Sequence, residues 1–109
     1  MKNKKAMISQ PMHGKSENEI VETKDKATQV LISKGYDIFN TYFKGEWCTD
    51  EVLELNGIKN KPLWFLAKSL EIMSKCDAVY FCKGWEDTRG CKIEHKIAVE
   101  YGMDIIYEE

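Results

Sequence analysis

The sequence lacks the features that mark membrane, secreted and nucleic-acid-binding proteins. No apolar run approaches the ~20 residues needed to cross a bilayer, and the N-terminal lysines lead into a strand-like segment and not a signal peptide. The net charge is only −2 and the lysines are scattered, whereas gripping a nucleic-acid backbone needs a concentrated basic surface. We therefore expect a cytosolic protein with neither a membrane nor a nucleic-acid polymer as partner.

Motifs for metals, redox chemistry and common cofactors are also scarce. The four cysteines are widely spaced and form no CxxC pair, so reduced thiols are expected. Cys91 and His95 lie four residues apart, but two ligands without a second pair do not make a zinc site. No GxGxxG or GxxxxGK[ST] motif occurs. We predict no metal and no cofactor.

What is present is the composition and periodicity of one folded α/β domain over residues 1–109. The chain is 43% apolar and 31% charged, which is ordinary for a globular domain of this length. Strand-like segments alternate with helical patterns that begin at Ser16, Pro62 and Cys91. This order predicts a mainly parallel sheet of four to five strands with helices on both faces. The strand-like segments are residues 5–10, 36–39, 78–82 and 104–107.

The segment 40–61 is irregular and is predicted to be a loop that could hold one helical turn. At roughly 20 residues it is longer than most structureless connections, and such loops commonly bind ligands. It contains Tyr42, Phe43 and Trp47, and either Tyr42 or Trp47 is a candidate to stack on a ligand. Ligands of parallel sheets bind beyond the carboxyl ends of the strands, where loops 9–14 and 83–90 also leave the sheet.

Glu94 stands out in the helix predicted at 91–101. At about 100° per residue, it falls near the middle of the apolar arc formed by Cys91, Ile93, Ile97, Ala98 and Tyr101. A carboxylate on the core-facing side of a helix is costly unless it is paired or faces a polar cavity. Glu94 is therefore a candidate catalytic residue, with pairing to a lysine or to the helix terminus as the alternative.

The loop before this helix adds further candidates. Asp87 with Glu94 would supply the two carboxyl groups that glycosidic cleavage uses, one facing an oxocarbenium-like carbon and one protonating the leaving group. Thr88, Arg89 and the backbone N–H of Gly90 suit a phosphate at a helix N-terminus. The alternative is a simple N-cap at Thr88 with Arg89 in solvent.

Three segments resemble the nucleoside 2-deoxyribosyltransferase-like superfamily, in particular its small phage- and prophage-associated members of the DUF4406 type. They are AMISQPMHGKS at 6–16, SKCDAVYF at 74–81 and GWEDTRGCKIEHKIAVEYG at 84–102. The resemblance implies a flavodoxin-like or Rossmann-like three-layer sandwich and homodimers in which a neighbouring subunit completes the pocket. It also implies a glutamate nucleophile that forms a covalent ribosyl intermediate, and this glutamate matches Glu94.

The resemblance also implies which ligand is bound. Members acting on free deoxynucleosides have an aspartate six positions before the nucleophile, and members that hydrolyse nucleoside 5′-monophosphates have a serine there. Here that position is Thr88, while Asp87 lies seven before, so the pattern favours a phosphate-bearing ligand and leaves the role of Asp87 open. Residues matched to the family's ligand site are Ser9, Gln10, Met12, Gly14 and Asp77, and Gly84 begins the matching segment 84–102. Trp85 is a further candidate to stack on a base, with a place in the core or at an interface as the alternative for it and for the aromatic residues of the long loop. For Asp77, capping the preceding helix is the alternative.

Three functions remain open at this stage. The first is an enzyme that hydrolyses the N-glycosidic bond of a nucleoside or nucleotide, or transfers its (deoxy)ribosyl group to a second base. The second is a non-catalytic protein that sequesters or senses a nucleotide-derived signal. The third is a structural or protein-interaction module. Recovery of a nucleotide with its base released or intact distinguishes the first from the second.

Overall fold

The computed structural model describes residues 3–109. Its helices and strands alternate along the chain as the sequence predicts, and short 3-10 helices, η1 and η2, precede α2 and α4. The elements are β1 (Lys4–Ser9), α1 (Glu17–Ser33), β2 (Tyr36–Phe39), η1 (Glu46–Cys48), α2 (Asp50–Leu55), α3 (Lys61–Met73), β3 (Ala78–Phe81), η2 (Trp85–Asp87), α4 (Arg89–Glu100) and β4 (Asp104–Tyr107).

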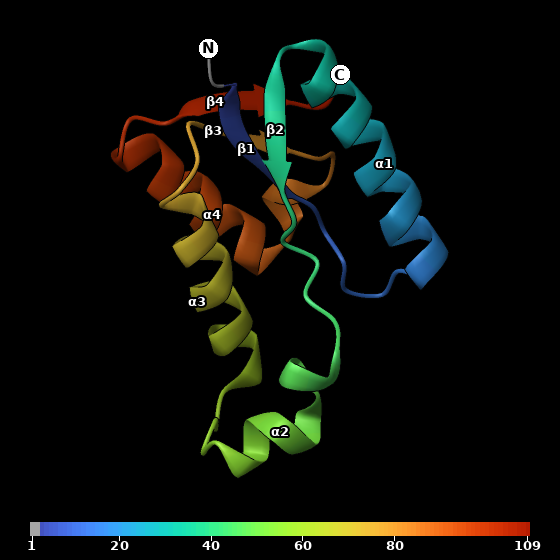
Figure 1. The fold of residues 1–109 in the computed structure, drawn as a ribbon, viewed down its shortest axis with the longest axis vertical. Helices are drawn as coiled ribbons and strands as arrows, with labels where there is room; N and C mark the ends of the chain where they lie inside the picture. The colour runs from blue at the N-terminus through green and yellow to red at the C-terminus, as the bar shows by residue number, and fades with distance from the viewer. Residues whose placement is uncertain (1–2) are drawn as a thin grey trace.

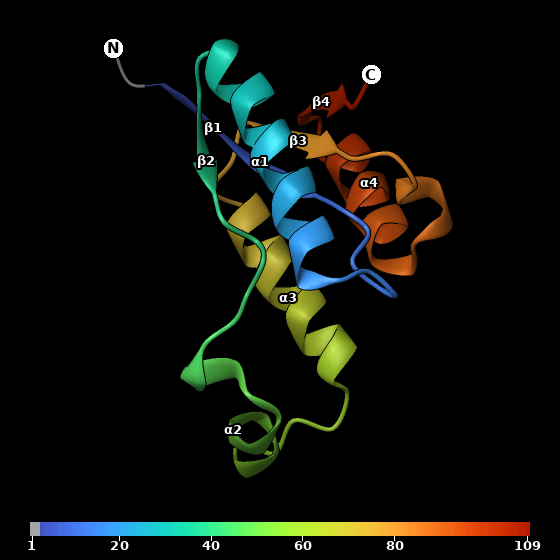
Figure 2. The same ribbon diagram turned by 90° about the vertical axis from the view of Figure 1, so that its right-hand side faces the viewer.

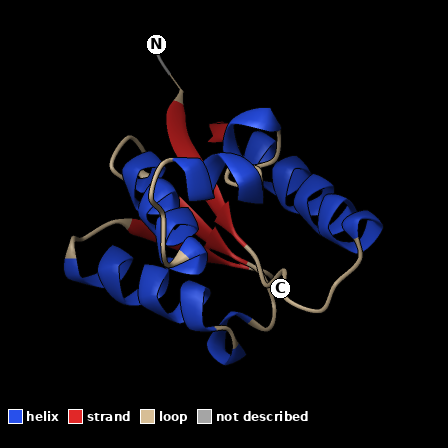
Figure 3. Cartoon of the chain, turned by 90° about the horizontal axis from the view of Figure 1, so that it is seen from below, coloured by secondary structure: helices blue, strands red, loops and turns tan. Residues whose placement is uncertain are grey.

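The four strands form one parallel sheet in the order β2-β1-β3-β4. Helix α1 covers one face, and α3 and α4 cover the other (Figures 1 and 2). Viewed from below, the strands lie between these helical layers (Figure 3). The predicted α/β class and the flavodoxin-like or Rossmann-like sandwich are confirmed, with four strands in the sheet.

Alternation along β1 decides which side chains meet which helix layer. Ala6 and Ile8 pack with Ala27 and Leu31 of α1, whereas Met7 belongs to the core on the opposite face. Since successive side chains of a strand point to opposite faces, Ser9 lies on the same side as Met7. The strand therefore delivers the Ser9 hydroxyl to the layer that contains α4.

The segment 40–61, expected to be a loop that could hold one helical turn, contains more helix than that, in η1 and the six-residue helix α2. The Thr49 side chain accepts a hydrogen bond from the backbone N–H of Val52, which satisfies a free donor at the helix start. Leu53 supplies a buried anchor. Gly57, with φ of 78°, then lets the chain turn after the helix. In Figure 1, α2 extends away from the sheet.

The boundaries of the other helices follow local capping signals. Ser16 accepts a hydrogen bond from the backbone N–H of Glu19, as an N-cap residue does, and its hydroxyl donates to Oε1 of Glu19. The helix predicted at 91–101 begins earlier, at Arg89, with Thr88 as its N-cap residue. Within residues 3–109, no helix is both long and apolar enough to span a membrane.

Candidate functional site

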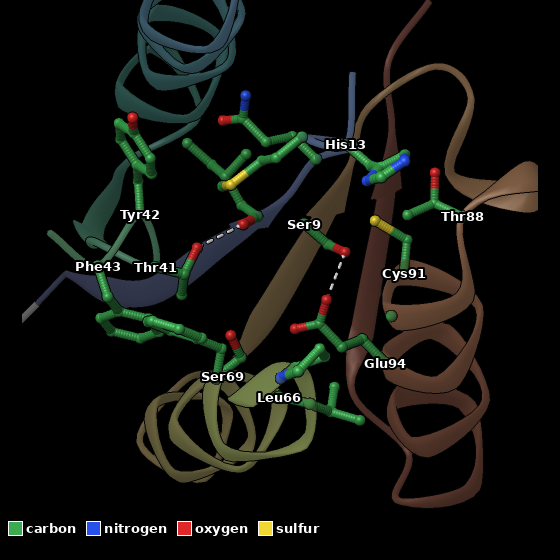
Figure 4. Close-up of a pocket in the computed structure, with 16 residues that line it drawn as sticks. Ser9, His13, Thr41, Tyr42, Phe43, Leu66, Ser69, Thr88, Cys91 and Glu94 are labelled. Atoms are coloured by element: carbon green, nitrogen blue, oxygen red, sulfur yellow. Dashed lines mark hydrogen bonds between the residues drawn. The ribbon is translucent and has the colours of Figure 1, made fainter. Parts of the chain in front are cut away.

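A cavity of about 380 Å³ opens at the carboxyl end of β1, between α3, α4 and the chain that follows β2 (Figure 4). Its walls come from segments far apart in the sequence, which only the folded sheet brings together. The lining residues are Ile8, Ser9, Gln10, Met12, His13, Thr41, Tyr42, Phe43, Pro62, Phe65, Leu66, Ser69, Thr88, Gly90, Cys91 and Glu94.

Glu94 projects from α4 into this cavity and is only 7% exposed. The Ser9 Oγ donates a hydrogen bond to its Oε1 at 2.9 Å. Burial raises the pKa of Glu94 to about 7, while the hydrogen bond from Ser9 acts in the opposite direction. Within the described chain, no lysine or arginine forms a salt bridge with Glu94. The carboxyl group therefore titrates near neutrality without a cationic partner.

The amino end of α4 forms the neighbouring part of the wall. Thr88 occupies the N-cap position, but its hydroxyl donates to the carbonyl oxygen of Gly84 at 3.2 Å and does not cap α4. Thr88 and Gly90 both line the cavity, as does His13 from the loop after β1. First-turn N–H groups without an intrahelical partner attract anions. This end of the cavity has the donors that a phosphate group requires.

Aromatic side chains form the opposite end of the cavity. Phe43, Trp47, Trp64 and Phe65 pack in succession, with ring centroids 6.1, 5.6 and 5.0 Å apart. Phe43 and Phe65 line the cavity together with Tyr42. Trp47 does not line the cavity, but it packs edge-to-face against Phe43. Figure 4 shows Tyr42 and Phe43 across the cavity from His13 and Thr88. The site therefore has an aromatic end and a donor-rich end, with Glu94 between them.

Ser9 at the end of β1 and Gln10 and Met12 of the loop that follows it all line the cavity. The Gln10 amide nitrogen donates to the carbonyl oxygen of Ile20 at 3.0 Å, so part of this side chain ties the loop to α1. Gly14 does not line the cavity and has a positive φ of 76°, which fits a turn in the loop.

Two predicted candidates from the loop before α4 lie elsewhere. Trp85 stacks on His95 with ring centroids 4.0 Å apart and an interplanar angle of 21°, and it also packs near Tyr107. Gly84 adopts the left-handed conformation that starts η2, with φ of 90°. The structure thus places Trp85 where it fastens this loop to α4 and β4, away from the cavity lining.

The charged candidates Asp77, Asp87 and Arg89 are also absent from the cavity lining. Asp77 lies at the opposite end of the sheet, where its Oδ2 accepts from the backbone N–H of Lys5 at 2.8 Å. This contact joins the starts of β1 and β3, which differs from both roles expected for Asp77. Asp87 is exposed in η2, and Arg89 lines a neighbouring groove between α3 and α4.

Sequence reasoning missed most of the wall contributed by the start of α3 and the end of β2. Helical periodicity assigns Leu66 to the core-facing stripe, and in the structure it is half-buried at the cavity. The position of Phe65 depends on how residues 40–60 fold, which no local pattern reveals. Tyr42 was considered as a ligand contact, but the other lining residues below were not part of the sequence-based site. They are Ile8, His13, Thr41, Phe43, Pro62, Phe65, Leu66, Ser69 and Cys91.

A groove with both polar and apolar lining residues lies between α3 and α4 and borders the cavity. Leu63 is 58% exposed and Ile93 is 39% exposed on its borders. Pro62, Leu66 and Gly90 line both the groove and the cavity. The groove therefore reaches the rim of the site.

No clustered set of three His, Cys, Asp or Glu side chains that could hold a metal ion occurs within residues 3–109. Comparison with curated proteins and with solved structures finds no match. A family pattern does match, and it spans residues 4–107, which include every strand, every helix and the whole cavity wall. The chain belongs to the family described as Domain of unknown function (DUF4406).

Proposed function

We propose that this chain cleaves the N-glycosidic bond of a nucleoside 5′-monophosphate with Glu94 as nucleophile, as a member of the nucleoside 2-deoxyribosyltransferase-like superfamily. The observation that carries the proposal is Glu94 itself. It is a nearly buried carboxyl group on a helix, with no cationic partner in the described chain, and it faces a cavity. Burial of such a group lowers the free energy of unfolding. Carboxyl groups whose pKa is strongly perturbed by burial are found preferentially at functional sites.

The cavity matches the three parts of a nucleotide in order. The backbone N–H of Gly90 and the side chain of His13 provide donors for the phosphate, and Phe43 with Phe65 provides flat apolar surfaces for the base. Glu94 lies between these ends, where the sugar would place its anomeric carbon. The volume of about 380 Å³ is that of a small-molecule site.

The proposed chemistry proceeds in two displacements. A lone pair of the Glu94 carboxylate forms a bond to the anomeric carbon, the bond from this carbon to the base nitrogen breaks, and the electron pair leaves with the base. The base takes a proton from solvent water, because Glu94 is the only carboxyl group among the lining residues. Water then attacks the anomeric carbon, releases Glu94 as a carboxylate and loses its extra proton to solvent.

A second base in place of water would make the same enzyme a transferase. Both reactions share the first displacement and differ only in the acceptor that enters the cavity. We assign hydrolysis as the main reaction because the cavity is open to solvent in the single chain. Recovery of free sugar phosphate in the presence of excess second base would support this assignment.

The direct test is chromatography of nucleoside 5′-monophosphates, and of the matching nucleosides, after incubation with the protein. We expect base release from at least one monophosphate, faster than from its nucleoside, and no release by the Glu94→Gln variant. The same substitution at exposed Glu100, also on α4, is the matched control and should retain activity. Intact ligands throughout a complete panel of bases and both sugars would refute the proposal.

The single carboxyl group in the cavity also favours a second candidate, binding without turnover. Glycosidases commonly use two carboxyl groups, and here Asp87 does not reach the lining. A protonated Glu94 would then act as a hydrogen-bond donor to a nucleotide. Calorimetry showing binding of a monophosphate, with the ligand recovered intact and weaker binding by Glu94→Gln, would establish this function instead.

We also propose that a second copy of the chain covers the groove between α3 and α4. Arg89, Ile93, Lys96 and Glu100 lie on one stripe of α4, at spacings of three or four residues. An antiparallel contact between two copies of α4 would place Arg89 against Glu100 of the other copy at both ends, with Ile93 near the centre. Such two-fold contacts are self-complementary.

This dimer can be tested by sedimentation of the Ile93→Lys variant. The proposed contact places Ile93 beside Lys96 of the other copy, so a second positive charge there should shift the protein to the monomer. Val21→Lys on α1 is the matched control, because Val21 is 37% exposed and Ile93 39% exposed, and it should leave the dimer intact. A wild-type protein that sediments as a monomer at high micromolar concentration would contradict the proposal.

A further inference from the structure

The contact between Ser9 and Glu94 treats the two oxygens of one carboxyl group differently. Ser9 Oγ donates to Oε1 at 2.9 Å, and both residues are buried, with Ser9 only 2% exposed. Within residues 3–109, this is the only side-chain hydrogen bond to Glu94, and no fully buried side-chain oxygen lacks a partner. The second oxygen, Oε2, is therefore not sealed in the protein, and Figure 4 shows it pointing into the cavity.

The backbone on both sides of this contact is fixed. Ser9 is the last residue of β1, paired with Phe81 of β3, and its carbonyl oxygen accepts from the backbone N–H of Cys82 at 3.0 Å. Glu94 lies in the second turn of α4. Groups placed on strands and helices keep their geometry better than groups on loops. The Ser9 hydroxyl thus sets the rotation of the Glu94 carboxyl plane from a rigid position.

We propose that Ser9 is a positioning residue that holds Oε1 of Glu94 and leaves Oε2 as the oxygen that attacks the anomeric carbon. This assignment rests on the proposed glycosidic cleavage. It goes beyond the resemblance, which implies only that Ser9 contacts the ligand, because it gives Ser9 a role in orienting the nucleophile. After attack, Oε2 becomes the ester oxygen and Oε1 the ester carbonyl, which still accepts the Ser9 hydrogen bond. When water attacks the anomeric carbon and the bond to Oε2 breaks, Ser9 stabilises the departing carboxylate.

Cys91 lies one turn before Glu94 in α4 and lines the same cavity, but it does not compete for the Ser9 proton. Burial raises the pKa of the Cys91 thiol to about 11, so the sulfur stays protonated near neutral pH. A neutral sulfur is a weaker acceptor than an ionised carboxylate. The single hydroxyl proton of Ser9 is therefore directed to Glu94 when Glu94 is ready to attack.

The test compares Ser9→Ala and Ser9→Thr with a Ser33→Ala control, an exposed serine at the far end of α1. The first readout is the pKa of Glu94, measured by carbon-detected NMR of the carboxyl group, which requires no turnover. Removal of one hydrogen bond to the charged form should raise this pKa by about one unit in Ser9→Ala. Ser9→Thr keeps the hydroxyl and should restore the wild-type value, and Ser33→Ala should not differ from wild type.

The second readout is the pH profile of base release. In Ser9→Ala the acidic limb should move to higher pH by the same amount, and kcat should fall by roughly tenfold or more with little change in KM. A wild-type pKa and pH profile in Ser9→Ala would overturn the proposal. The two proposals can also fail separately. If the pKa of Glu94 shifts in Ser9→Ala but the wild-type protein releases no base, the proposed reaction is refuted, and the hydrogen bond by which Ser9 positions Oε1 is still supported. If Ser9→Ala does not fold, the comparison rests on Ser9→Thr, which keeps the hydroxyl. A pH profile of base release in Ser9→Thr that differs from that of Ser33→Ala would then contradict the proposal.

Discussion

The two walls of the cavity are built in different ways. One wall consists of Ser9 at the end of β1 and of Cys91 and Glu94 in α4, all of them buried and fixed by the sheet or the helix. The other wall consists mainly of the chain that follows β2, in which the Thr41 hydroxyl donates to the Ile8 carbonyl oxygen at 2.7 Å and Phe43 packs on Trp47. The rigid wall has the geometry that bond cleavage requires, and the loop wall provides the surface for recognition.

This difference predicts that changes in the two walls affect different kinetic constants. The largest effect should come from Glu94→Gln, which removes the nucleophile but keeps the shape and a hydrogen-bond acceptor for Ser9. We expect base release to fall by at least about a thousandfold. Steady-state kinetics with a cleaved monophosphate measures the change. A loss below tenfold would place the chemistry on another residue.

The buried carboxyl group of Glu94 in the rigid wall should also lower the free energy of unfolding at high pH. Glu94 has a raised pKa of about 7 against a usual value of 4.5. Below pH 4.5 it is protonated in both the folded and unfolded states, and between pH 4.5 and 7 only the unfolded state loses the proton, so stability falls. Above pH 7 the cost is constant, at about 3 kcal/mol.

Glu94→Gln should therefore be more stable than wild type by about 3 kcal/mol at pH 8, with little difference at pH 4. Urea denaturation of both proteins at the two pH values measures this, and comparing the variants removes the contribution of all other titrating groups. Equal stability at pH 8 would show that the carboxylate is solvated or paired in the folded protein.

On the loop wall, Phe43→Ala should raise KM by about tenfold and change kcat little, because it removes base contact area without moving Glu94. Phe43→Tyr keeps the ring and should restore KM. The measurement is again steady-state kinetics, at pH 8 where Glu94 is mostly ionised. A decrease in kcat without a change in KM would contradict the assignment of chemistry to the rigid wall and of base recognition to the loop wall.

The smallest effect is expected at Asp87, which belongs to neither wall. Asp87→Asn removes an exposed carboxylate in η2 and should change kcat/KM by less than about twofold. A large loss of kcat/KM would show that Asp87 moves into the cavity when a nucleotide binds and protonates the base.

The sequence predicts Glu94 because the angular position of a residue in a helix depends only on spacing. The parallel sheet is likewise predictable, because alternating strands and helices leave few alternatives. The bond from Ser9 to Glu94 joins residues 85 positions apart, and no local pattern contains it. For Trp85, in contrast, the sequence suggested a ligand contact that the structure does not contain. The left-handed turn at Gly84 and the one-turn η2 direct its ring onto His95, away from the cavity.

The central claim is that Glu94 forms a covalent bond to the sugar, and mass spectrometry under denaturing conditions tests it most directly. A 2-fluoro-substituted nucleoside 5′-monophosphate should release its base and leave a sugar phosphate attached to the protein, because fluorine beside the reacting carbon slows the second displacement. The account predicts an adduct on the peptide that contains Glu94, and none in Glu94→Gln. Base release without an adduct, or an adduct on another residue, would contradict it.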